Sequence, residues 1–73
     1  MMYKILIINE NHEQYGLIAR VPITGDRISF IDSDTTFVTL EVVNVTLSAY
    51  PIKNTNVYPT THTVATVFVK PIN

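Results

Sequence analysis

The chain has 73 residues, of which only 15% are charged, and its net charge is −1. A chain of this length forms one domain whose core is small and whose stability is marginal. The absence of cysteine excludes disulfides, thiolate zinc sites and thiol catalysis, and the weak charge argues against nucleic acid as a partner.

The first half of the sequence predicts three short strands. Residues 2–8 are apolar on both faces, which is typical of a strand buried on both sides or paired on both edges. A polar loop at residues 9–14 and a second strand at residues 15–21 follow, and Pro22 ends that strand because it has no N–H to donate. Gly25 is free to take a positive φ in a turn over residues 23–26. The third strand is expected at residues 27–31.

A long fourth strand is predicted at residues 35–50, after a short turn at residues 32–34. Its apolar positions alternate, and the phase of the alternation changes between Val42 and Val43. One face of the strand can stay buried only if one extra residue is inserted there. The pattern therefore predicts a β-bulge that bends this strand.

The last strand is expected at residues 63–69, where the sequence TVATVFV carries no charge and no proline. Left exposed at an edge, such a strand would promote aggregation, so it must be paired inside the sheet or covered by another chain. We expect Val42, Val67 and Phe68 in the core. The predicted fold class is all-β: residues 1–73 form a single small SH3-like barrel of about five strands with a bent fourth strand.

Three segments carry a resemblance to a known class of proteins. They are residues 21–28, which include Val21-Pro22 and Gly25-Asp26, then residues 37–45, and finally residues 66–69. This arrangement resembles short SH3-like proteins of phages and bacteria, in which a P-x-x-G-D-x-V segment precedes a hairpin and a V-x-V-x-P strand closes the barrel. Where that pattern has a glycine in the hairpin, this chain has Ser33 or Asp34.

The polar segment at residues 51–62 is the candidate binding site. Tyr50 and Tyr58 each precede a proline there, which gives two rigid amphipathic side chains at low entropic cost. Lys53 and His62 lie in the same segment, so the predicted partner-binding residues are Tyr50, Lys53, Tyr58 and His62. The alternative is that the tyrosines only pack over the end of the barrel.

The remaining polar residues are better explained as surface or turn residues than as metal ligands or catalytic groups. His12 and His62 have no spacing that would fix a metal ion with nearby carboxylates. Thr61 beside His62 lacks the surroundings of a nucleophile, and turn formation explains Asp32 and Asp34. We therefore expect no catalytic residue, no metal and no cofactor, and hence a protein that is not an enzyme.

The charge distribution suggests how the protein acts. Residues 1–41 have a net charge of −3, whereas residues 42–73 have +2 and are rich in Thr, Asn and Tyr. Charge depletion with retained tyrosine is typical of an interface core, and the alternative is an ordinary β-sheet surface, where Thr is common. We expect a non-enzymatic protein-binding or self-associating module, as an accessory or inhibitor protein of a phage or mobile element. The alternative is a small barrel that binds a small ligand or single-stranded nucleic acid.

The apolar runs also suggest a location. The longest, residues 5–8, is far shorter than the roughly 20 residues that cross a bilayer, and shorter than the apolar region of about 7–15 residues in a secretion signal. We therefore expect a cytoplasmic protein with no membrane partner.

Overall fold

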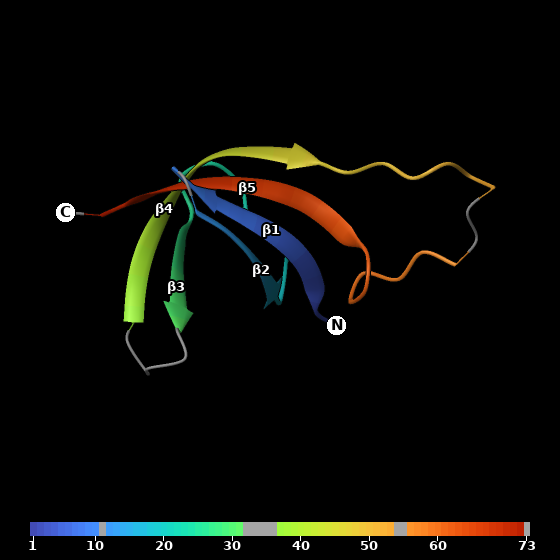
Figure 1. Cartoon of the computed structure of the whole chain (residues 1–73), viewed down its shortest axis with the longest axis horizontal. Helices are drawn as coiled ribbons and strands as arrows, with labels where there is room; N and C mark the ends of the chain where they lie inside the picture. The colour runs from blue at the N-terminus through green and yellow to red at the C-terminus, as the bar shows by residue number, and fades with distance from the viewer. Residues whose placement is uncertain (11, 32–36, 54–55, 73) are drawn as a thin grey trace.

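The structure is a computed structural model that describes residues 1–10, 12–31, 37–53 and 56–72. These residues form a single curled sheet in the order β2-β1-β5-β4-β3 (Figure 1). Its strands are β1 (Tyr3–Asn9), β2 (His12–Ile18), β3 (Arg27–Ile31), β4 (Phe37–Leu47) and β5 (Thr63–Pro71). The predicted all-β fold with five strands is confirmed, and the sheet curls into a half-barrel.

The pairing of β1 with β5 is parallel, and this direction follows from the number of strands. Each successive strand reverses direction in an up-and-down arrangement, so the first and fifth strands run the same way. When the sheet curls and these strands meet, they pair in parallel, with Ile5 opposite Ala65 and Ile7 opposite Val67. The strands β2 and β3 remain at the two edges of the sheet.

The core lies on the concave face of the sheet. Because side chains alternate across a strand, every second residue of the central strands faces inward. The core cluster consists of Ile5 and Ile7 on β1, Ile28 on β3, Leu40 and Val42 on β4, and Ala65, Val67 and Val69 on β5. No polar residue is buried among the described part of the chain.

The predicted β-bulge is confirmed at the expected place. Val42 lies opposite Val69 and Asn44 opposite Phe68, so Val43 is the extra residue. The first half of β4 pairs with β3, from Arg27 opposite Glu41 onward, and the second half continues along β5 beyond the end of β3. The bend therefore divides β4 into a part inside the half-barrel and a part that leaves it.

Two other predictions are confirmed. Gly25 has a φ of 97° in the turn before β3. The uncharged last strand is central, with β1 on one side and β4 on the other. The predicted turn at residues 32–34 lies outside the described residues.

The second strand was predicted too late in the sequence. Instead of a loop at residues 9–14, β1 extends to Asn9, Glu10 has a φ of 53°, and β2 already begins at His12, which lies opposite Asn9. His12 and Glu13 are exposed although they belong to a strand, because β2 is an edge strand that pairs only with β1. Polar residues at an edge look like a loop when the sequence is read alone.

The expectation that Phe68 is a core residue was wrong. Val67 is fully buried and Val42 is 1% exposed, whereas Phe68 is half-buried on the convex face. The alternation along β5 explains the difference, because Phe68 lies between the inward-facing Val67 and Val69.

Candidate binding surfaces

The loop between β4 and β5 brings together three of the four predicted binding residues. The rings of Tyr50 and His62 meet edge to face, with centroids 5.5 Å apart and an interplanar angle of 86°. The backbone N–H of Tyr58 donates to Nδ1 of His62 at 3.0 Å, and Oγ1 of Thr61 lies 3.1 Å from the same nitrogen. The imidazole thus holds residues 58–62 in a compact turn.

This turn is fastened to the rest of the barrel. The Tyr50 hydroxyl donates to the backbone oxygen of Thr63, and the N–H of Lys4 donates to the backbone oxygen of Pro59 at 2.6 Å. Tyr50 and His62 therefore join the two ends of the loop to each other. Tyr58 keeps 57% of its surface exposed and is the free aromatic surface of this cluster.

Lys53 is exposed and follows Ile52, which is 99% exposed. The loop leaves the sheet and extends to one side in Figure 1, and the molecule measures 44 Å along its longest axis and 24 Å along the next. The predicted site is therefore a cluster at the base of the loop with an isolated apolar side chain farther out.

The distal half of β4, residues 43–47, is a second candidate surface. Leu47 is 70% exposed and Val43 is 42% exposed, although the register places Leu47 on the same face as the buried Ala65. Residues 42–52 carry no charge. Beyond Val42 this half of β4 pairs with β5 on one side, and none of the described strands pairs with its other edge.

A turn at residues 20–26, the anchored turn, lies beside this edge and is held by several hydrogen bonds. The Asp26 carboxylate accepts hydrogen bonds from Arg20 at 2.8 Å and from the N–H of Ile23 at 2.9 Å. The bond from Arg20 and the one from Ile23 hold the pKa of Asp26 below its ordinary value. Gly25 donates to the oxygen of Val42, whose own N–H donates to the oxygen of Asp26, both at 2.8 Å.

Next to the anchored turn is an open apolar cleft of about 450 Å³. Its lining residues are Val21, Pro22, Ile23 and Thr24 from the turn, and Val45 and Leu47 from β4. Ile23 is 66% exposed. An open apolar cleft therefore separates the turn from the side chains of Val45 and Leu47 on β4.

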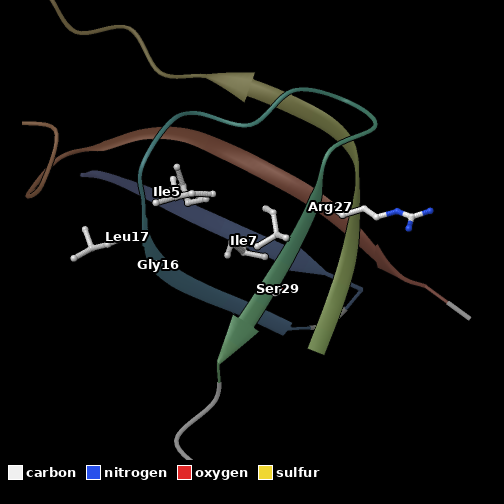
Figure 2. Close-up of a pocket in the computed structure, with 8 residues that line it drawn as sticks. Ile5, Ile7, Gly16, Leu17, Arg27 and Ser29 are labelled. Carbon is white, nitrogen blue, oxygen red and sulfur yellow. The ribbon is translucent and has the colours of Figure 1, made fainter. Parts of the chain in front are cut away.

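A third surface lies between the two edge strands, where the barrel is open. No Cα atom of β2 lies within 8 Å of a Cα atom of β3 along these two described strands, whereas paired strands are about 4.8 Å apart. The cleft between them has a volume of about 510 Å³, and Figure 2 shows Ile5 and Ile7 on its floor. The two strands that border it contribute residues 16–18 and 27–29.

The convex face carries a further apolar patch. Leu6 lies opposite Tyr15 on β2, and Lys4 lies opposite Leu17. The ammonium group of Lys4 sits 4.5 Å from the centre of the Tyr15 ring, which is a cation–π contact. Tyr15 and Leu17 are 58% and 59% exposed.

The described residues contain no cluster of three or more His, Asp or Glu side chains that could hold a metal ion. They also contain no helix long and apolar enough to cross a membrane. Asp32 and Asp34, which turn formation was expected to explain, lie outside the described residues.

Sequence reasoning missed the free edge of β4. The signal was present in the phase change at Val42 and Val43, because a strand bent at that point extends past its shorter partner β3. Only the observed register, in which Arg27 at the start of β3 lies opposite Glu41 while β4 continues to Leu47, shows that the extension is unpaired.

Comparison of this chain with models of protein families, with curated proteins and with solved structures finds no match.

Proposed function

We propose that this chain is a non-enzymatic protein-binding module that acts by self-association. The observation that carries the proposal is the uncharged run at residues 42–52, which leaves the half-barrel with Leu47 and Ile52 largely exposed. Apolar side chains that project from a small domain favour contact with another protein surface. We place this activity in the cytoplasm, as an accessory protein of a phage or mobile element.

The small core of the chain and its lack of disulfides support self-association. A domain of this size gains little stability from its own core, and the chain has no cysteine with which to form a disulfide. A second copy would cover apolar surface that the chain itself leaves in water. The net charge of −1 opposes such an association only weakly.

The test is a measurement of molar mass by size-exclusion chromatography with light scattering over a wide range of concentrations. We expect a mass above that of one chain that increases with concentration. A monomer at every concentration would contradict the proposal.

The cleft between β2 and β3 supports a second function, the binding of a small apolar ligand. Its volume of about 510 Å³ lies within the range of about 300–1,000 Å³ that is usual for ligand sites. A screen of small apolar compounds by thermal shift tests this function. The expected hit loses its effect in Ile18→Lys, because that substitution places a charge at the cleft, and it is retained in Leu47→Lys.

A further inference from the structure

We infer that two copies of this chain join edge to edge through the distal half of β4, about a two-fold axis that passes at Thr46. The inference rests on the proposed self-association and specifies the surface that performs it. Two sheets would then become one continuous sheet across the axis, as when a strand adds to an exposed edge.

The orientation of the backbone supplies the first argument. The N–H of Ser48 donates to the oxygen of Val64 in β5 at 2.8 Å. Peptide groups in an antiparallel pair alternate between pointing toward the partner and away from it. The peptide groups of Val45 and Leu47 therefore point away from β5, toward the free edge.

The single chain confirms this orientation at Val45. Its N–H is bonded to the side-chain oxygen Oδ1 of the preceding Asn44 at 2.9 Å. Among the described residues no backbone group bonds the peptide groups of Val45 or Leu47 from the free side. These two residues thus offer donors and acceptors on the edge, with one donor occupied by a local side chain.

An antiparallel pairing centred on Thr46 uses all of these groups. Val45 exchanges two hydrogen bonds with Leu47 of the partner subunit, and Leu47 exchanges two with Val45 of the partner subunit. Thr46 then lies opposite Thr46 of the partner subunit in a non-hydrogen-bonded pair, with Cα atoms about 4.5 Å apart. On dimerisation the N–H of Val45 exchanges its acceptor, from Oδ1 of Asn44 to the backbone oxygen of the partner's Leu47.

Side chains and charge identify the occupant as a second copy. In this arrangement the exposed Leu47 lies beside Val45 of the partner subunit, next to the cleft that Ile23 borders. Residues 42–52 have no charge, so two identical edges meet without repulsion. The two-fold pairing is self-complementary, because each edge offers the same donors, acceptors and apolar side chains to the other.

The chain contains no cysteine, so a single introduced thiol gives a direct test. Thr46→Cys places two thiols across the axis, at a Cα separation within the range of about 4.4–6.8 Å that a disulfide requires. The matched control is Thr66→Cys, because Thr66 is the cross-strand neighbour of Thr46 and would be about 14 Å from its own copy.

Under mild oxidation we expect Thr46→Cys to form a covalent dimer rapidly, at concentrations where Thr66→Cys stays monomeric in a denaturing gel. Equal rates for the two variants, or no covalent dimer of Thr46→Cys from a self-associating protein, would overturn the inference. Circular dichroism establishes that both variants retain the sheet.

A second pair of variants measures the strength of the edge. Leu47→Lys puts two like charges near the axis and removes an apolar contact, and we expect the dissociation constant to increase at least about 10-fold. Leu17→Lys changes another exposed leucine, on β2, which is 59% exposed against 70% for Leu47, and should leave the dissociation constant within about 3-fold of the original.

The outcomes separate the inference from the proposed function. If Leu17→Lys dissociates the assembly and Leu47→Lys does not, the chain self-associates through its convex face and the β4 edge is the wrong surface. If the unmodified protein is a monomer at all concentrations and Thr46→Cys gives no covalent dimer, both the function and the inference are wrong.

Discussion

The inward direction of Val67 and the outward direction of Phe68 predict opposite consequences for the same substitution. Val67 is fully buried between its pairing partners Ile7 and Val45. In Val67→Lys the protein loses about 1.5–3 kcal/mol of apolar burial. It also has to bury an ammonium group, which costs several kcal/mol. The sum approaches the total of about 5–15 kcal/mol that folds an ordinary domain, so we expect this variant to be unfolded.

Phe68→Lys should remain folded, because the side chain points to the convex face and is only half-buried. The new ammonium group can reach water while its aliphatic stem covers part of the surface that the ring covered. We expect a loss of about 1–2 kcal/mol, which lowers the melting temperature by several degrees. The assay is thermal unfolding followed by circular dichroism at low protein concentration.

The opposite result would refute the register of β5. A shift of one residue moves every side chain of a strand to the other face. A folded Val67→Lys together with an unfolded Phe68→Lys would therefore mean that β5 presents Phe68 to the core.

Four further variants test local contacts. The hydrogen bond from Arg20 keeps Asp26 ionised to a lower pH in the folded chain than in the unfolded chain. Its contribution to stability is therefore complete above the ordinary value of about 3.9 and is lost as the pH falls through the lowered pKa, so the melting temperature of Asp26→Asn should decrease less on acidification. Gly25→Ala should cost about 1–2 kcal/mol in urea unfolding, a purely conformational cost because its φ is 97° and nothing lies within 4 Å. Tyr50→Phe loses the hydroxyl bond to the backbone at the start of β5 and should lower the free energy of unfolding by about 0.5–1.5 kcal/mol. Asn44→Ala removes the local acceptor of the edge amide, and sedimentation analysis should show a dimer about 2- to 10-fold tighter.

Features set by local patterns could be predicted from the sequence. The bulge at Val43 follows from a change in the phase of alternation, and the turn at Gly25 follows from the freedom of glycine. The third strand, β3, has the predicted bounds because a turn precedes it and its apolar residues alternate. These signals depend only on residues that are close in the sequence.

Features that depend on distant parts of the chain could not be predicted. His12 and Glu13 belong to a strand only because β1 supplies the hydrogen bonds. Phe68 was expected in the core together with its neighbour Val67, but the register with β1 and β4 decides which of two adjacent apolar residues faces inward. The aromatic cluster of the loop was foreseen as a set of residues, and its contacts were not.

The edges of the sheet differ in how they are protected, and this difference bears on the proposed function. Natural sheets keep their edges from pairing with other chains by placing charged residues there. The edge strand β2 carries Glu13 and the edge strand β3 begins with Arg27, both exposed. The free half of β4 has no charged residue, and it is protected locally by the hydrogen bond that the N–H of Val45 donates to Oδ1 of Asn44.

A neutral side chain is a weaker barrier than a charge, because a partner strand can take over its hydrogen bond without separating or burying an ion. Beyond the bend at Val43, this edge extends past Arg27, the first residue of β3, and a second chain can reach it there. The same residues that curl the sheet into a half-barrel therefore leave one edge both accessible and uncharged. An edge of this kind would make a soluble monomer prone to aggregation, and a symmetric dimer is the closed arrangement that covers it without leaving a further edge of the same kind.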